Sequence, residues 1–410
     1  MKPPGPHYWG AGGLTGYFIM AECLWPTDHL FTTPGTYPAD VAIEEGVESL
    51  FFDGLPYDGK PTRVYAYFGM PSIPVDGPVP GIVLVHGGGG TAFAKWVRLW
   101  NSRGYAAIAM DLNGCVPVGV YGSWNHHEWG GPSGISAADI GLLDTIDLPV
   151  NDQWYYHAVA AVIRAHSLLR SIEGVDKDRI GVTGLSWGGY TVCIVAGIDA
   201  RFRFAVPVYG CGFIEEMSFW TPQFENLGVQ RRARWADLWD PRQYLPGASM
   251  PMLWVTGTND FAYPLASFQR SYRIASGPRT LCIRIRMPHG HDGPGENPAE
   301  IHAFADSMVG QGPPLAQVTS QVLEGSQLRA TYTGPFGIES AELVYTLSDN
   351  DNWEQREWQS APTILDREAH TVNAHIPCGV TTAFLNLVDS RQCVVSTEHV
   401  VISATELIGG

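Results

Sequence analysis

The 410-residue chain contains very little lysine. Its only lysines are Lys2, Lys60, Lys95 and Lys177, so arginine supplies nearly all of the positive charge. Acidic residues outnumber basic ones by 41 to 25, which gives a formal net charge of −16. Nucleic acids and anionic membranes both attract basic protein surfaces. The composition therefore predicts neither a nucleic-acid partner nor a membrane partner.

Paired cysteines and long apolar runs are also missing. The seven cysteines show no C-x-x-C spacing, which argues against a zinc or redox motif. The apolar stretch at residues 17–25 is interrupted by Glu22 and is too short to cross a bilayer. The first residues lack the apolar segment of a signal peptide. We expect a soluble protein, cytoplasmic as the sequence stands, or secreted or periplasmic if a signal peptide was removed.

The composition and the hydrophobic pattern change along the chain, and these changes predict two domains after an N-terminal arm. Residues 1–44 are rich in glycine, proline and aromatics without a period, so we expect an irregular arm. Residues 45–313 alternate strand and helix patterns, which predicts an α/β domain with a doubly wound, mostly parallel sheet. After a Gly/Pro-rich linker, residues 314–410 carry short alternating strands, which predict a β-sandwich domain.

Individual elements of the α/β region can be placed from their periodicity. A helical stripe covers Asp152–Ile172, and a proline-led start opens a second helix that ends near Met308. The long segment 116–150 reads as a lid-like insertion between a core strand and the next helix. The predicted strands are Arg63–Phe68, Gly81–His86, Ala106–Asp111, Arg179–Thr183, Phe204–Tyr209, Met252–Thr256 and Leu281–Met287.

The most informative motif is G-L-S-W-G at residues 184–188. It follows an apolar strand pattern and leads into an apolar helix pattern, which is the context of a nucleophile elbow. The flanking glycines suit a sharp turn in which side chains would clash. Such a turn exposes the Ser186 hydroxyl and leaves the Trp187 backbone N–H free to stabilise an oxyanion. The motif therefore predicts a nucleophilic serine.

A nucleophilic serine of this kind needs an acid and a base that follow it in the sequence. Asp260 is the best acid, because it lies in the loop directly after the strand Met252–Thr256. Asp237 and Asp240 are rivals, but no strand pattern precedes them. His289 and His291 both follow the last predicted strand, and we favour His291 as the base with His289 as the alternative.

A glycine run after the strand that ends at His86 completes the predicted site. Glycines offer backbone N–H groups without obstructing side chains, so Gly88 and Gly89 are candidate oxyanion donors together with Trp187. The run lacks the Lys-Ser/Thr of a phosphate-binding loop. This pattern favours acyl transfer over phosphate binding.

The chain resembles the α/β-hydrolase superfamily in these motifs: Leu84–Gly90, Asp178–Tyr190, Gly257–Asp260 and the Gly-His pair at 290–291. More narrowly, it is similar to the acetyl xylan esterase and dienelactone hydrolase branch, which is related to prolyl-oligopeptidase-type catalytic domains. The resemblance implies a Ser186, Asp260 and His291 triad and no cofactor. The chain departs from these families by having no N-terminal propeller pattern and by carrying a C-terminal β-domain.

These observations predict a serine esterase that works through an acyl-enzyme, with a small-molecule or carbohydrate ester as substrate. The resemblance favours a short acyl group such as acetyl. Trp124 and His127, from the insertion, are candidate substrate contacts. The neighbouring His-His-Glu run matches no zinc spacing, so we expect no metal. The sequence carries no signal for an oligomeric state.

Two other functions remain open. A peptidase or amidase of the prolyl-oligopeptidase type would use the same triad, although no paired-glutamate anchor for a substrate amine is present. A non-catalytic protein of this fold could instead bind carbohydrate or a partner chain. The C-terminal β-domain could serve such binding, or it could pack against the core as a buttress.

Overall fold

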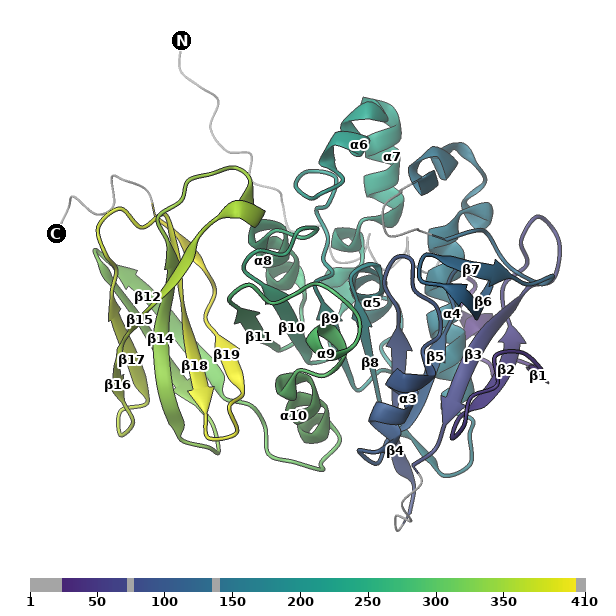
Figure 1. The fold of residues 1–410 in the computed structure, drawn as a ribbon, viewed down its shortest axis with the longest axis horizontal. Coiled ribbons are helices and arrows are strands. Elements are labelled where there is room, and N and C mark those ends of the chain that lie inside the picture. Colours follow the sequence, from purple (N-terminus) through teal and green to yellow (C-terminus); the bar gives the residue numbers. More distant parts are fainter. Residues whose placement is uncertain (1–23, 72–76, 135–140, 403–410) are drawn as a thin grey trace.

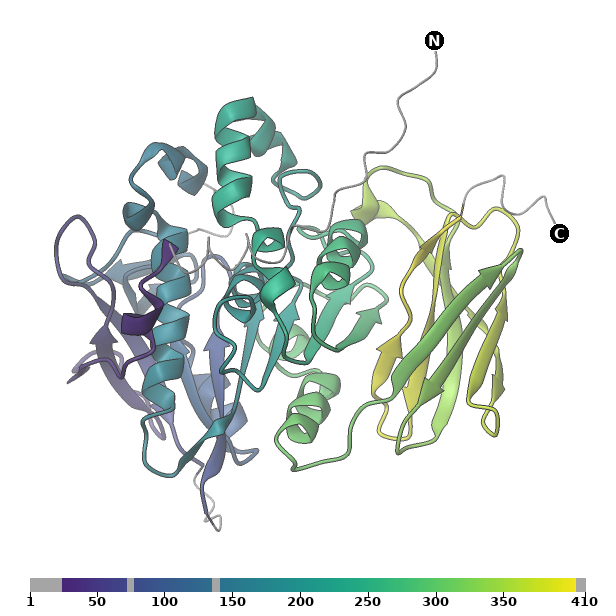
Figure 2. The same cartoon turned by 180° about the vertical axis from the view of Figure 1, so that it is seen from behind.

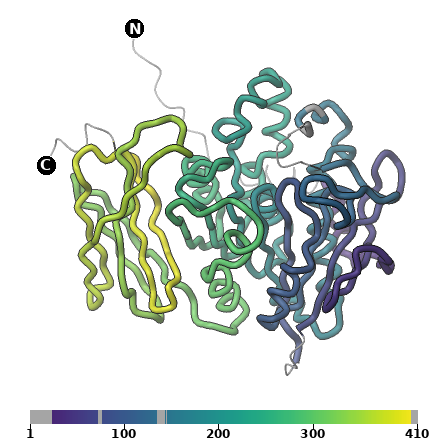
Figure 3. Tube along the Cα trace, viewed as in Figure 1, coloured from purple at the N-terminus to yellow at the C-terminus, as the bar shows by residue number. Residues whose placement is uncertain are grey.

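The computed structural model describes residues 24–71, 77–134 and 141–402. Its chain forms an α/β part and, beside it, a part built from antiparallel sheets (Figure 1). The trace coloured by residue number shows the C-terminal part of the chain gathered beside the α/β part (Figure 3). This arrangement confirms the predicted fold class.

The α/β part is built on one nine-stranded sheet. Its strands are β1 Thr36–Pro38, β2 Glu48–Asp53, β3 Arg63–Gly69, β4 Val79–Val85, β5 Ala106–Met110, β8 Val175–Leu185, β9 Phe204–Val208, β10 Met252–Gly257 and β11 Arg279–Arg284. The spatial order is β1-β2-β3-β5-β4-β8-β9-β10-β11. From β5 to β11 the neighbours are parallel, whereas β1, β2 and β3 add antiparallel pairs at one end. The carboxyl ends of the parallel strands therefore share one edge.

Helices cover both faces of this sheet (Figures 1 and 2). The helices are α2 Thr27–Leu30, α3 Ala94–Asn101, α4 Trp154–Leu169, α5 Trp187–Ala196, α6 Thr221–Asn226, α7 Val229–Trp239, α8 Leu265–Ile274, α9 Gly293–Glu296 and α10 Ala299–Met308. Short 3-10 turns are η1 Gly141–Asp147, η2 Val150–Asp152, η3 Pro241–Gln243 and η4 Leu245–Gly247. Helices α3 and α10 lie on one face, and α4, α5 and α8 lie on the other.

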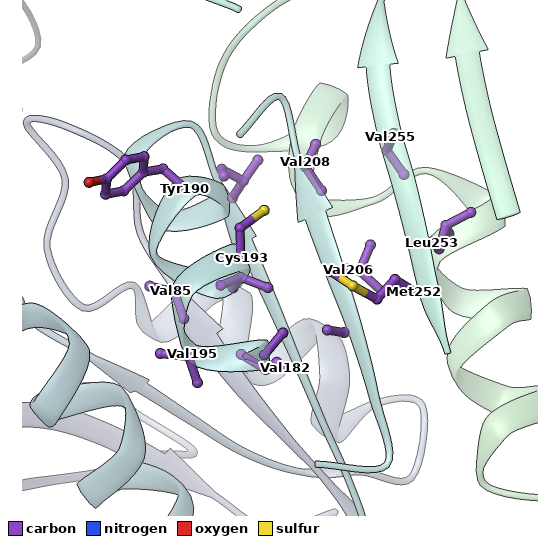
Figure 4. Close-up of a cluster of buried hydrophobic side chains, with 14 of the residues drawn as sticks. Val85, Val182, Tyr190, Cys193, Val195, Val206, Val208, Met252, Leu253 and Val255 are labelled. Atoms are coloured by element: carbon purple, nitrogen blue, oxygen red, sulfur yellow. The ribbon is translucent and has the colours of Figure 1, made fainter. Parts of the chain in front are cut away.

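Helix α5, which follows the G-L-S-W-G turn, lies in the centre of the core. Every residue of this helix is buried, as expected for a helix that is apolar all round. Cys193 and Val195 belong to one buried apolar cluster with valines of β4, β8, β9 and β10 (Figure 4). Each fully buried side chain of this size stabilises the fold by about 1.5–3 kcal/mol. The turn at residues 184–188 is therefore anchored at both ends by buried, rigid elements.

The C-terminal part consists of two antiparallel sheets. Its elements are β12 Gln317–Glu324, β13 Gln327–Thr333, β14 Ile338–Thr346, η5 Trp353–Gln355, β15 Trp358–Pro362, β16 Ile364–Asp366, β17 Thr371–His375, β18 Thr382–Asp389, β19 Val394–Ser396 and β20 Val400–Val401. One sheet has the order β12-β13-β17-β16, and the other has the order β15-β14-β18-β19 with β20 on β18. The sheets pack on each other, as Figure 2 shows from behind.

The second of these sheets covers the β11 edge of the nine-stranded sheet (Figure 1). Ser396 of β19 accepts the backbone N–H of Ile283 at 2.8 Å, and Asn386 of β18 donates to the carbonyl of Ile283 at 3.2 Å. Beside these bonds, Val344 and Phe384 form a buried apolar cluster with Leu265 and Ile283. The interface thus joins the two parts through both polar and apolar contacts.

The N-terminal arm and the insertion are more ordered than their composition predicts. Within residues 24–44 the chain forms α2 and β1, and β1 pairs with β2. The insertion 116–150 begins with a hairpin of β6 Cys115–Val120 and β7 Ser123–His126. Residues 1–23 and 135–140 of these two predictions lie outside the described residues. Among the helices of the described ranges, none has the length and apolar character needed to cross a membrane.

Candidate active site

Ser186 lies at the tip of the turn between β8 and α5 and has φ 56° and ψ −118°. A positive φ is uncommon for a residue other than glycine, and such strain is typical of functional turns. The backbone N–H of Ser186 donates to the carbonyl of Val208 at 2.9 Å, and Tyr190 N–H donates to the carbonyl of Ser186. These bonds hold the strained residue between two buried elements.

The glycines around Ser186 are required by close backbone contacts. A Cβ on Gly188 would lie 2.1 Å from the carbonyl oxygen of Val85, and one on Gly184 would lie 2.6 Å from the backbone of Gly188. Both distances are far below van der Waals contact. The G-x-S-x-G spacing is thus imposed by the approach of β4 and α5 to the turn.

Asp260 follows β10 and is 2% exposed. Its Oδ1 accepts the backbone N–H groups of Ala262 and Tyr263 at 3.0 and 2.8 Å. Its Oδ2 lies 2.6 Å from Nδ1 of His289. Charge-assisted bonds of this length are among the stronger ones in proteins. Because Nδ1 faces the carboxylate, Nε2 of His289 is left free to exchange a proton.

The sequence favoured His291 as the partner of Asp260, and the structure pairs Asp260 with His289 instead. Two aromatic rings hold the imidazole of His289: Tyr209 stacks on it at 4.4 Å between centroids, and Phe261 contacts it at 4.7 Å. Tyr209 also donates its hydroxyl to the carbonyl of Pro288 at 2.9 Å. The loop after β11 therefore directs His289, rather than the residue two positions later, toward the acid.

His291 forms a second histidine–carboxylate pair. Its Nδ1 lies 2.9 Å from Oε1 of Glu296, a buried side chain at the end of α9. Its Nε2 accepts the backbone N–H of Gly87 at 3.1 Å. Because Nε2 is an acceptor, the ring proton is on Nδ1 and is donated to Glu296. His291 thus contacts the glycine run and Glu296, whereas Asp260 contacts His289.

His86 holds the glycine run from the opposite side. Its Nε2 accepts the N–H of Leu112 at 2.9 Å, so its Nδ1–H donates to the carbonyl of Gly87 at 2.7 Å. Burial lowers the pKa of His86 to about 3. The ring is therefore neutral at physiological pH, as this pair of hydrogen bonds requires.

The β6–β7 hairpin fixes the carbonyls of the same run. Tyr121 donates its hydroxyl to Gly88 O at 2.9 Å, and Trp124 donates Nε1–H to Gly89 O at 2.8 Å. The N–H of Gly122 also donates to Gly89 O at 2.9 Å. These contacts point the carbonyls toward the hairpin. An early part of the insertion thereby shapes the glycine run.

A pocket of about 190 Å³ joins these groups. It is lined by Gly87, Gly88, Tyr121, Leu185, Ser186, Trp187, Tyr209, Trp220, Phe261, His289, Gly290 and His291. The serine, both histidines and two predicted oxyanion donors therefore meet in one aromatic cavity. Its volume is below the several hundred Å³ typical of pockets for larger ligands.

Three of the residues predicted for the site lie elsewhere. Gly89 is not among the described residues that line the pocket, and its carbonyl is bound to Trp124. Trp124 therefore supports the glycine run. His127 packs its ring on Phe51 at 4.9 Å, away from the pocket.

The rival acid Asp240 accepts the N–H groups of Phe213 and Arg242, so its carboxylate is used in holding loops together. In the described ranges, no three His, Cys, Asp or Glu side chains converge as metal ligands.

Comparison with known proteins finds two similar families. Residues 45–215 match the family model of acetyl xylan esterase, and residues 149–305 match that of the prolyl oligopeptidase family. Among solved structures, acetyl xylan esterase from Paenibacillus sp. R4 aligns with a TM-score of 0.55 at 19% identity, covering 74% of this chain and 96% of that one. The chain has an α/β-hydrolase fold and resembles acetyl xylan esterases.

A second esterase structure supports the same fold. Acetyl xylan esterase 1 from Thermoanaerobacterium sp. JW/SL YS485 aligns with a TM-score of 0.55 at 16% identity, covering 72% of this chain and 93% of that one. A search of curated proteins found no match. The comparisons support a carboxylic ester hydrolase that is similar to acetyl xylan esterases.

Sequence reasoning did not identify several side chains that organise this site. Glu296 carries a signal that could have been used, because it is an acidic residue five positions after His291. Tyr209 ends a predicted strand, and its φ of 56° could not be read from the sequence. Tyr121 lies in the insertion, from which the sequence analysis chose Trp124 and His127 as substrate contacts, and its hydrogen bond to Gly88 was not predicted.

Proposed function

We propose that this protein is a serine esterase that hydrolyses short-chain carboxylic esters through an acyl-enzyme intermediate. The observation that carries the proposal is the cavity that Ser186 shares with His289, whose other ring nitrogen is bound to the buried Asp260. A serine, a histidine and an orienting carboxylate in this relation are the parts of a nucleophilic triad. The order along the chain is that of α/β hydrolases.

In the proposed reaction, Ser186 Oγ attacks the acyl carbon while Nε2 of His289 takes its proton. Asp260 accepts the Nδ1–H of His289 and stabilises the imidazolium that forms. The proton then passes to the departing alcohol, which leaves the acyl group on Ser186. Water attacks the acyl-enzyme with His289 again as base, which releases the carboxylic acid and restores the serine.

The oxyanion is proposed to bind the backbone N–H groups of Gly88 and Trp187. Both residues line the cavity, and Trp187 is the first residue of α5, where helix N–H groups favour negative charge. The Gly87 N–H is already bound to His291, so His291 is assigned the role of holding the loop. Each donor of this kind contributes about 3–4 kcal/mol to the transition state.

The acyl group is proposed to be short, with acetyl as the first choice. A cavity of about 190 Å³ lined by Trp187, Tyr209 and Trp220 leaves little room beyond the reacting atoms. The match to the acetyl xylan esterase model favours a carbohydrate-like alcohol. Aromatic faces at the cavity suit the C–H faces of sugar rings.

The test is p-nitrophenyl acetate hydrolysis by Ser186→Ala, with Ser102→Ala as a control at an exposed serine. We expect Ser186→Ala to lose activity by about 10⁴-fold or more and Ser102→Ala to retain it. Mass spectrometry of the wild type under turnover should detect one acetyl group on the peptide that contains Ser186. Activity of Ser186→Ala within about tenfold of the wild type would refute the triad.

A second candidate is a peptidase or amidase, because residues 149–305 match the prolyl oligopeptidase family. The same triad would attack an amide carbonyl. A panel of acetylated xylo-oligosaccharides, p-nitrophenyl esters and aminoacyl amides separates the two. The esterase proposal requires the highest kcat/KM on acetyl esters, whereas the peptidase requires it on the amides.

A further inference from the structure

The loop that carries Asp260 is bound by the C-terminal sandwich. The connection between β14 and β15 leaves the sandwich and extends toward the α/β part (Figures 1 and 3). It contains the short turn η5, and Nε1 of Trp353 at the start of that turn donates to the backbone carbonyl of Asp260 at 2.7 Å. A residue 93 positions away thus binds the same residue whose carboxylate faces His289.

A second residue of the Asp260 loop makes matching contacts. Asn259 donates through Nδ2 to the carbonyls of Glu354 and Arg356, each at 2.8 Å. Arg286, on the loop after β11, adds a longer bond to the carbonyl of Arg356 at 3.3 Å. The segment 353–356 therefore connects the loop that carries Asp260 with the loop that leads to His289.

We infer that Trp353 is a positioning residue for the catalytic acid, so that the C-terminal sandwich is a working part of the active site. The inference rests on the proposed role of Asp260. Within its own domain, Asp260 is held by the N–H groups of Ala262 and Tyr263, which fix the carboxylate relative to its loop. The bonds from residues 353–356 fix the loop relative to the C-terminal sandwich.

The consequence for catalysis follows from geometry. The Asp260–His289 contact of 2.6 Å exists only if the two loops keep their spacing. A displacement of about 1 Å in a catalytic group can lower the rate by on the order of 100-fold. Loss of the Trp353 N–H should therefore reduce kcat. Among the described residues, Trp353 does not line the substrate cavity, so the KM should stay the same.

The experiment compares Trp353→Phe with Trp358→Phe in the full chain. Both substitutions remove one indole N–H from this region of the sandwich. Nε1 of Trp358, the first residue of β15, has no hydrogen-bond partner in the part of the chain that is described. We expect Trp353→Phe to lower kcat about tenfold with little change in KM, and Trp358→Phe to keep kcat within about twofold of the wild type. The low-field proton resonance of the His289 Nδ1–H should shift or broaden only in Trp353→Phe.

A second matched pair covers the case in which Trp353→Phe does not fold. Asn259→Ala removes the bonds to Glu354 and Arg356, and Gln269→Ala removes a bond from α8 to the carbonyl of His399, which also crosses between the two parts. Asn259→Ala should lower kcat by about tenfold, and Gln269→Ala should not. The comparison separates a local effect on Asp260 from a general loss of domain contact.

The outcomes distinguish this inference from the proposed function. Asp260→Asn should lose about 10⁴-fold in kcat if the triad is correct. If Asp260→Asn is that impaired while Trp353→Phe and Asn259→Ala match their controls in kcat and in the His289 resonance, the positioning role is overturned and the triad stands. If Asp260→Asn keeps wild-type activity, the triad itself fails, and the positioning role fails with it.

Discussion

Gly87 donates its backbone N–H to Nε2 of His291 across 3.1 Å. That single bond gives the two histidines of the H-G-H sequence different partners, since His289 binds Asp260. In the proposed mechanism, His289 takes the proton of Ser186, and His291 holds the loop beside the oxyanion. The two roles predict different sensitivities to substitution.

We expect His289→Ala to reduce kcat for p-nitrophenyl acetate by about 10⁴-fold, because it removes the base. His291→Ala should reduce kcat by roughly 10- to 100-fold, because it releases Gly87 without removing a reacting group. Steady-state kinetics on both variants provides the measurement. A larger loss in His291→Ala than in His289→Ala would reverse the proposed roles.

Glu296 supplies a control for the loop-holding role of His291. Glu296→Leu leaves the buried Nδ1–H of His291 without an acceptor, at a cost of about 1–3 kcal/mol. Glu296→Gln still offers an amide oxygen and should stay close to the wild type. Equal kcat values in the two variants would show that Glu296 does not act through His291.

The volume of the cavity predicts a steep dependence on acyl length. Wild-type kcat/KM should fall from p-nitrophenyl acetate to the octanoate by at least roughly 100-fold, because a tight pocket rejects added methylenes at about 1–3 kcal/mol each. Trp220→Ala should relax this preference by removing one aromatic wall. A series of p-nitrophenyl esters provides the measurement.

Trp129→Ala is the control for that series. Trp129 is exposed and stacks with Arg63 outside the cavity, so its loss should leave the length preference unchanged. A wild-type enzyme that cleaves octanoate as fast as acetate would contradict the proposed short acyl group.

Buried His86 predicts a loss of stability in acid. Its pKa is about 3 in the folded protein, because burial disfavours the charged ring, and its ordinary value is 6.5. Between these values the unfolded chain binds the proton and the folded chain does not, so each pH unit below about 6.5 costs roughly 1.4 kcal/mol. The contribution is fully present above pH 6.5 and is lost progressively as the pH falls toward 3.

Urea unfolding at a series of pH values measures this slope. His86→Gln removes one titrating group, so its stability should fall less steeply with acid than that of the wild type, whatever its absolute stability. Other buried histidines have lowered pKa values for the same reason, among them His302 and His399, so part of the slope should remain. An unchanged slope in His86→Gln would contradict the assignment.

The sequence was sufficient to predict the α/β architecture because its elements are strongly patterned. The central strands and the buried helix α5 are continuous apolar runs, and the glycines at 184 and 188 reflect a local backbone constraint. Strand β1 was missed because its three residues have no period of their own, and it forms through pairing with β2. Periodicity therefore predicts elements that are buried on both faces better than those at an edge.

The choice between His289 and His291 was beyond sequence reasoning. Both follow the same predicted strand, two and four positions after its end at Met287, and both are residue types that suit a base. What separates them is the positive φ of residues on either side of the loop and the ring of Tyr209, which stacks on only one of them. The Tyr209 ring comes from the residue directly after β9, about 80 residues earlier in the chain, and no spacing rule predicts its contact with His289.

The covering of β11 by β19 has a consequence for how this enzyme can be studied. A terminal strand of a sheet presents unpaired N–H and C=O groups, which recruit strands from other molecules. Here Ser396 and Asn386 occupy such groups of Ile283 with side chains, so the edge is closed without a continuing ladder. Cutting the chain near residue 313 would open this edge to self-association. Aggregation of a truncated chain would then reflect an unprotected strand, whereas single substitutions at Trp353 and Asn259 leave this edge covered.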